Sequence, residues 1–222
     1  MNMKELLISA MVILCAGSQC ARRGVSETDA ADGSLPGPQA VLARMRADTL
    51  WIRRLEEMAD SALGPGARCL DPVWHLFLYE DRTWFFNQDW GGVLEIPSDF
   101  LPEDDGYQAY FSFHGTRAFS PDSLVMVSFY AGMQGLTFEE RFDAIQEDLT
   151  ADGLRIVALQ LEDRSFAVHA VSDEGIHYYG REIFDDVEGI EYCVSVQYPD
   201  GRDVSRIIPM VDRYPYGPVT DM

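Results

Sequence analysis

Four histidines offer the side chains of this sequence that are best suited to chemistry near neutral pH, because imidazole can accept a proton or bind a metal ion there. They are His75, His114, His169 and His177. Each lies in a segment whose pattern predicts a β-strand, and no two of them have the short spacing of a metal-binding motif. We therefore predict packed strand residues and no metal site, with His169 and His177, on consecutive strands, as the pair to test.

A nucleophilic site would need a hydroxyl group beside a histidine and a carboxylate. Ser128 or Ser165 with His169 and Asp173 is the combination that this sequence offers. Nothing in the sequence fixes the geometry of these residues, so the combination is a weak indication of catalysis.

The motifs that identify common enzyme classes are absent. The sequence contains no Gly-x-Ser-x-Gly, Gly-x-Gly-x-x-Gly, phosphate-binding loop, His-Glu-x-x-His or Cys-x-x-Cys. Acidic turns at 103–106, 173–175 and 200–203 lack the alternating carboxylates of a calcium-binding loop. We predict no cofactor and no enzymatic activity.

Residues 1–19 have the features of an export signal. Lys4 precedes the apolar run 6–16, and small and polar residues follow it. The run is too short to cross a bilayer, which takes about 20 residues. We expect a signal peptide at 1–19 and export of the rest of the chain.

Two cleavage sites compete at the end of this signal. Ala16-Gly17-Ser18 fits ordinary signal peptidase, whereas Gly17-Ser18-Gln19-Cys20 resembles a bacterial lipobox, although Gly17 and Gln19 depart from the usual residues. The cysteine count favours the lipobox, because lipidation of Cys20 leaves an even pair. We expect Cys20 to carry the lipid anchor of a periplasmic or outer-membrane lipoprotein.

The chain after the signal divides into a tether and one domain. Residues 20–39 are small, polar and rich in turn formers, which predicts a flexible tether. Residues 40–222 are expected to form a single α+β domain.

Cys69 and Cys193 are the cysteines of that domain. In an exported protein they could form a disulfide that closes about 124 residues and contributes ~4–5 kcal/mol. If the two positions are distant, both are buried thiols.

Aromatic residues are dense around 74–111, and Trp84, Trp90 and Tyr110 are the ones that we predict to form a ligand or partner surface. The alternative for these residues is core packing.

The elements that position these residues follow from periodicity and turn chemistry. Apolar residues at helical spacing predict helices at 39–63, after Thr137, and at 203–213. Thr137 and Glu140 form a capping box. Strands are predicted at 74–80, 83–87, 93–97, 107–114, 123–131, 154–162, 165–172, 175–183 and 190–198. Their short connections favour antiparallel pairing.

The order of these elements is similar to that of the PsbP-like domains, named after an extrinsic protein of photosystem II. The similarity rests on five segments and covers about 90–213: Val93-Leu94-Glu95-Ile96-Pro97, Val125–Tyr130, Thr137-Phe138-Glu139-Glu140-Arg141, Phe166-Ala167-Val168-His169-Ala170 and Tyr178-Tyr179-Gly180-Arg181. It implies a central antiparallel sheet of about six strands between helices, and a family of binding or assembly factors without a shared catalytic apparatus.

Composition limits the class of partner. The chain of 222 residues is 47% hydrophobic, so it can form a core, and it has 17 basic against 37 acidic residues for a net charge of −20. This sign argues against nucleic acid. We expect a non-catalytic envelope protein that binds a protein partner or small ligand; the alternative is a hydrolytic or metal-dependent enzyme that uses the strand histidines. Histidines gathered with a carboxylate in a cleft would favour the enzyme, whereas dispersed, packed histidines and an exposed aromatic patch would favour binding.

Overall fold

The computed structural model describes residues 38–102, 108–110 and 113–216. The predicted signal, Cys20 and most of the tether lie outside the described residues. The helices are α2 (Pro38–Ala47), α3 (Thr49–Leu63), α4 (Phe138–Ala151) and α5 (Ile208–Arg213). The strands are β1 (Arg68–Asp71), β2 (Leu76–Tyr79), β3 (Arg82–Phe86), β4 (Val93–Ile96), β5 (Leu101–Pro102), β6 (Gln108–Tyr110), β7 (Phe113–Phe119), β8 (Met126–Met133), β9 (Leu154–Leu161), β10 (Ser165–Ser172), β11 (Ile176–Asp185) and β12 (Ile190–Pro199).

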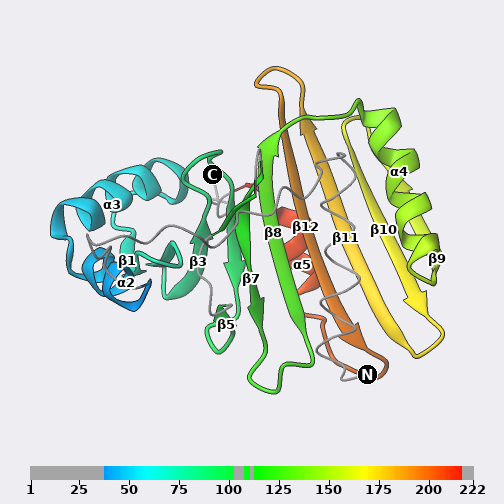
Figure 1. Cartoon of the computed structure of the whole chain (residues 1–222), viewed down its shortest axis with the longest axis horizontal. Coiled ribbons are helices and arrows are strands. Elements are labelled where there is room, and N and C mark those ends of the chain that lie inside the picture. The colour runs from blue at the N-terminus through cyan, green and yellow to red at the C-terminus, as the bar shows by residue number, and fades with distance from the viewer. Residues whose placement is uncertain (1–37, 103–107, 111–112, 217–222) are drawn as a thin grey trace, which may run out of the picture.

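The predicted α+β class is confirmed, and all strand pairs in the described residues are antiparallel. The strands form two sheets. The small one has the order β1-β2-β3-β4, and the larger one has the order β5-β7-β8-β12-β11-β10-β9, with β6 also paired to β7. The larger sheet therefore exceeds the expected six strands. Figure 1 shows α4 in front of the larger sheet and α5 behind it, with the small sheet and α3 at one side.

The helix predicted at 39–63 is two helices, because Asp48 interrupts it. Its backbone is extended, and its carboxylate accepts the N–H groups of Leu50 and Trp51 at 3.1 and 3.0 Å. An aspartate that caps a new helix satisfies donors that otherwise have no partner. The last predicted helix is also shorter than expected, since α5 covers only Ile208–Arg213.

The capping box of α4 is confirmed. The Glu140 N–H donates to the Thr137 hydroxyl at 3.2 Å, and the Thr137 N–H donates to the Glu140 carboxylate at 2.9 Å. The helix packs Phe138, Ile145 and Leu149 onto apolar side chains of β10 and β11. None of the helices in the described part of the chain is long and apolar enough to cross a membrane.

A buried ion network lies between α4 and the sheet. The Arg141 guanidinium donates to both carboxylate oxygens of Glu182 on β11, each at 2.7 Å. A second carboxylate, that of Glu191 on β12, lies 3.3 Å from Arg141 Nε. Burial, followed by the negative charge of Glu182, raises the pKa of Glu191 to about 8. The single guanidinium does not offset both effects, because it is shared between two carboxylates.

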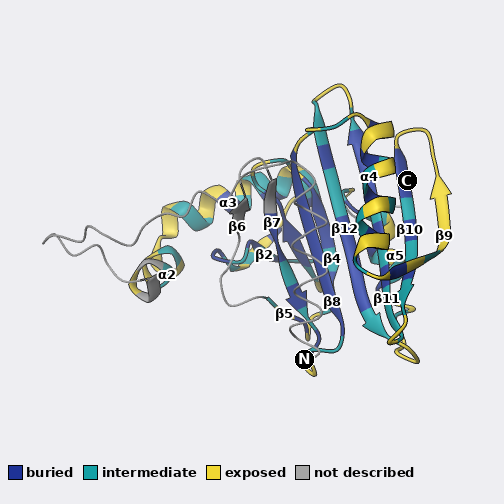
Figure 2. Cartoon of the chain, turned by 45° about the vertical axis from the view of Figure 1, so that its right-hand side comes forward, coloured by how far each residue is buried: buried dark blue, intermediate teal, exposed yellow. Residues whose placement is uncertain are grey.

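The opposite face of the larger sheet covers the main core. Val127, Phe129, Val194 and Val196 pack there against α5 and against one face of the small sheet. The other face of the small sheet packs on α3, so the small sheet is buried on both sides. Figure 2 shows that burial is deepest in the strands at the junction of the two sheets.

Candidate functional site

The two histidines predicted as a pair do lie together, on the face of the larger sheet that α5 also covers. In the register of β10 and β11, His169 lies opposite Tyr179 and Val171 lies opposite His177. The two imidazoles are therefore diagonal neighbours on one face, within reach of each other. We call the surface formed by His169, His177, Tyr179, Arg181 and Asp200 the histidine face.

Three side chains of this face form a hydrogen-bonded chain. His169 Nε2 lies 2.9 Å from His177 Nδ1, and His177 Nε2 lies 2.6 Å from Asp200 Oδ1. The His177 ring also stacks on Tyr198, with ring centroids 4.9 Å apart and an interplanar angle of 7°. His177 is thus held on both its edge and its face.

This chain determines which nitrogens carry protons when both rings are neutral. A carboxylate only accepts, so His177 donates from Nε2 to Asp200 and its Nδ1 becomes an acceptor. His169 then donates from Nε2, and its own Nδ1 keeps a lone pair. Burial, followed by the nearby His177, lowers the pKa of His169, which favours the neutral form of this ring.

Gly175 allows Asp200 to reach His177. The Asp200 N–H donates to the Gly175 carbonyl at 2.8 Å, and Gly175 has a φ of +75°. A Cβ at this position would lie 2.5 Å from Asp200 Oδ2. The turn between β10 and β11 therefore needs glycine both for its backbone conformation and for the space that the carboxylate fills.

A pocket of about 250 Å³ lies on the same face, and one of its lining residues, Tyr179, lies opposite His169 in the register of β10 and β11. It is lined by Gln160, Glu162, Ser165, Ala167, Tyr179, Arg181 and Asp212. The Tyr179 hydroxyl donates to Asp212 at 2.5 Å, while Arg181 donates to the Asp212 carbonyl and lies 3.5 Å from the Glu162 carboxylate. Burial, followed by the bond to Asp212, raises the pKa of Tyr179, so this hydroxyl keeps its proton. The pocket offers donors and acceptors side by side.

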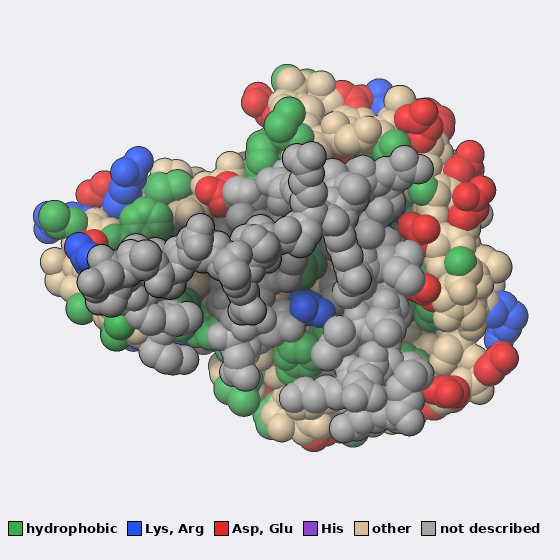
Figure 3. All heavy atoms as spheres, viewed as in Figure 1, with side chains coloured by type: hydrophobic (Ala, Val, Ile, Leu, Met, Phe, Trp, Pro, Cys, Tyr) green, Lys and Arg blue, Asp and Glu red, His purple; other side chains and the backbone are tan. Residues whose placement is uncertain are grey.

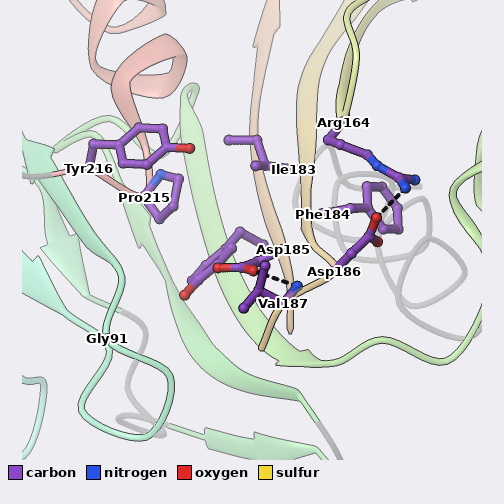
Figure 4. A pocket seen from close by; sticks show the side chains of 10 residues that line it. Gly91, Arg164, Ile183, Phe184, Asp185, Asp186, Val187, Pro215 and Tyr216 are labelled. Atoms are coloured by element: carbon purple, nitrogen blue, oxygen red, sulfur yellow. Dashed lines mark hydrogen bonds and ion pairs between the residues drawn. The ribbon is translucent and has the colours of Figure 1, made fainter. Parts of the chain in front are cut away.

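A larger pocket, of about 460 Å³, lies at the end of the larger sheet near the turn between β11 and β12 (Figure 4). Its two acidic residues are already engaged. Asp185 accepts the N–H groups of Val187 and Glu188 at 3.0 and 3.1 Å, and Asp186 pairs with Arg164. These carboxylates stabilise the turn between β11 and β12, so this pocket is a weaker candidate for a ligand site than the pocket beside Tyr179.

The predicted nucleophilic combination is not assembled. Ser128 lies on the other face of the sheet, with its hydroxyl 2.7 Å from that of Ser195. Ser165 lies on the same side of the sheet as the histidines, but its hydroxyl donates to Glu162 at 2.8 Å. The carboxylate that contacts the histidines is that of Asp200, not that of Asp173.

The prediction that Trp84 belongs to an exposed aromatic surface is wrong. This side chain is 2% exposed, packs in the core of the small sheet and donates from Nε1 to the Tyr79 carbonyl at 3.3 Å. Trp90 is half-buried, and its carbonyl accepts the Tyr192 hydroxyl at 2.8 Å. Tyr110 lies in β6, and its side chain is outside the described residues. Core packing therefore accounts for Trp84, because an apolar strand between two packing layers is buried on both faces.

Cys69 and Cys193 are free thiols, so the possible disulfide is not formed. Cys69 lies in β1 of the small sheet, whereas Cys193 lies in β12 at the centre of the larger one. Burial, followed by the charge of Glu56, raises the pKa of Cys69 to about 12.

The other two histidines are not part of the histidine face. His75 lies between β1 and β2 and is 2% exposed, and its burial lowers its pKa to about 4. His114 lies in β7, and its side chain is outside the described residues. Within the described ranges, no group of three or more His, Cys, Asp and Glu side chains is arranged to hold a metal ion.

Sequence reasoning missed Asp200, Asp212 and Arg181. Asp200 follows β12 directly and pairs back across the sheet, while Asp212 comes from α5, which forms the end of the helix predicted at 203–213. The alternation of Tyr179 and Arg181 on one face of a predicted strand was a usable signal for a polar patch.

Comparisons with known proteins give no further information about this site, because neither the models of known families nor the curated proteins include a match to the chain.

Proposed function

We propose that this protein is an exported binding protein, anchored to the cell-envelope membrane through Cys20, whose histidine face holds a small polar ligand. The observation that carries the proposal is a pocket with both hydrogen-bond donors and acceptors on the same sheet face as the hydrogen-bonded His169, His177 and Asp200. Rigid polar groups beside a small pocket are typical of ligand sites.

The charges around the pocket indicate the ligand chemistry. Glu162 and Asp212 are acidic and Arg181 is basic, so these three side chains sum to −1. The volume lies below the ~300–1,000 Å³ of pockets that enclose drug-sized molecules. The ligand that fits is therefore a small neutral or cationic molecule with O–H or N–H donors.

Catalysis is the second candidate, and the carboxylate–histidine–histidine chain is the observation that favours it. This is the association of histidines with a carboxylate that we expected of an enzyme. A neutral imidazole oriented by a carboxylate can act as a general base. Binding is preferred because the hydroxyls that line the pocket, those of Ser165 and Tyr179, already donate to Glu162 and Asp212.

Ligand-detected NMR would test the binding function. The probes are glucose, galactose, ethanolamine and putrescine, with acetate and phosphate as anionic controls, added to the wild type and to His169→Gln. We expect a neutral or cationic probe to bind the wild type at least about tenfold more tightly than the variant. The Asp173→Asn variant, altered at an exposed residue of the neighbouring turn, should bind like the wild type.

The same variants separate the two candidates. Hydrolysis of p-nitrophenyl acetate that is lost in His169→Gln, with no probe bound by the wild type, would favour the enzyme. Anionic probes as the only ligands, or binding that His169→Gln leaves intact, would contradict the proposed site.

The anchor is tested separately by labelling cells with radioactive palmitate. We expect label on the wild type and none on Cys20→Ala. A wild-type chain without label would remove the anchor from the proposal and leave the ligand site to its own test.

A further inference from the structure

The strand β9 forms one edge of the larger sheet. One side of β9 pairs with β10, and no strand of the described chain lies on the other side. Figure 2 shows β9 at the rim of the sheet, exposed over most of its length. Its eight residues therefore present unpaired backbone donors and acceptors to the surroundings.

The side chains of β9 are unusually apolar for an exposed edge. Val157, Leu159 and Leu161 are 42%, 38% and 59% exposed. The strand contains no proline, lysine or acidic residue, which are the residues that commonly prevent edge pairing. A register shift opposite His169 and Ala170 leaves Val157 as the extra residue of a bulge, while Leu159 and Leu161 stay in register with β10.

The charges at the two ends of β9 are opposite. Arg155 lies opposite Val171 of β10, and Glu162 follows the strand and accepts the Ser165 hydroxyl on the histidine face. A second β9 in antiparallel orientation would set Arg155 of each copy beside Glu162 of the other, and Ile156 beside Leu161. A parallel copy would set like charges side by side.

We propose that two copies of the chain associate by antiparallel pairing of their β9 strands, which joins the two larger sheets into one across a two-fold axis. The apolar side chains supply the attraction, because the net charge of −20 repels the copies as whole molecules. The pairing needs no ligand at the histidine face, although one of its residues, Glu162, also lines the pocket there.

Sedimentation velocity over a wide range of concentrations tests this pairing. The full chain carries Cys20→Ala in every sample, so that lipid cannot cause association. We expect a dimer that dissociates about tenfold or more readily in Val157→Lys and in Arg155→Glu. The Val187→Lys variant is the matched control, because Val187 is 91% exposed and lies on the turn between β11 and β12.

Charge exchange identifies the partner as a second copy. We expect the double variant Arg155→Glu, Glu162→Arg to recover the dimer that Arg155→Glu loses, with circular dichroism showing that each variant is folded. A wild type that remains monomeric at every concentration would overturn the proposal. A dimer that Val157→Lys and Arg155→Glu do not weaken would also overturn it, since its interface would lie elsewhere.

Discussion

Asp200 decides which nitrogen of His169 carries a proton, although the two side chains do not touch. Its carboxylate lies 2.6 Å from His177 Nε2, and His177 passes the constraint on through its 2.9 Å bond to His169. A residue at the end of one strand thus sets the hydrogen-bonding character of a residue two strands away.

Asp200→Asn should remove this constraint. An amide can donate as well as accept, so neither ring would be held to one tautomer. We expect the ¹⁵N shifts of both histidines to change from those of single tautomers to those of mixtures. Asp173→Asn should leave the ¹⁵N shifts unchanged. Single tautomers retained in Asp200→Asn would contradict the hydrogen bonding described for Asp200, His177 and His169.

Glu191 gives the stability a specific pH dependence. Its pKa of about 8 in the folded protein exceeds the ordinary value of 4.5, so between these values the folded state holds a proton that the unfolded state has released. Stability from this group therefore falls as the pH rises through that window.

Glu191→Gln should abolish this loss. We expect the free energy of unfolding of the variant, relative to that of the wild type, to rise by at least ~1 kcal/mol between pH 5 and pH 8 and little more above pH 8. Thermal unfolding at each pH measures this difference. Glu139→Gln, at an exposed position of α4, serves as the control and should show no such trend. A constant difference between variant and wild type across the pH range would contradict the raised pKa.

Among the elements, α4 is the one whose beginning is most strongly specified by local sequence. Its capping box uses two side chains three residues apart, which is visible without any tertiary information. The hairpin of β2 and β3 was also predicted, but its turn lies one residue earlier than residues 81–82, since Glu80 and Asp81 take positive φ values of 50° and 59°.

Thr137→Ala tests how much this cap contributes. Loss of the hydroxyl leaves the Glu140 N–H without its partner, so urea denaturation should show a loss of ~1 kcal/mol. Thr49→Ala, at the first residue of α3, is the comparison and should change the free energy of unfolding by less than ~0.5 kcal/mol. Equal effects of the two changes would show that the cap adds nothing.

Local signals therefore predicted α4 and the strands β8 to β12 well, but they missed β1 and β5 and gave one strand at 107–114 where β6 and β7 lie. They also did not report what depends on distant packing. The burial of Trp84 follows from α3 covering the small sheet, and no pattern within β3 reports that contact. The predicted pairing of His169 with His177 succeeded because consecutive antiparallel strands have a nearly fixed register. Asp200 and Asp212 could not be placed, because their positions depend on how the chain returns after β12.

At the scale of the molecule, the small and larger sheets are held together by packing rather than by a covalent link. Cys69 and Cys193 lie in different sheets as free thiols, and the main core joins the sheets through Phe85 and Phe129, whose ring centroids are 4.0 Å apart. Acidic side chains are numerous on the outside, and Figure 3 shows them gathered on the side where α4 lies.

Stability should therefore be insensitive to reducing agent. We expect the same midpoint of thermal unfolding with and without dithiothreitol, and two thiols per domain that react with maleimide only after denaturation at neutral pH, Cys69 most clearly because of its raised pKa. A midpoint that falls on reduction would mean that a disulfide forms.

The last strand of the described residues, β12, lies at the centre of the larger sheet, where it separates β8 from β11. Hairpins such as β10–β11 can form as soon as they are synthesised, but β8 must wait for residues 190–197 before it gains its second neighbour. Pairing β8 with β12 closes a long loop, and contacts between residues far apart in the sequence form slowly in folding. Until β12 arrives the nascent sheet has two additional open edges, so a chain halted before residue 190 would be left as two unjoined halves.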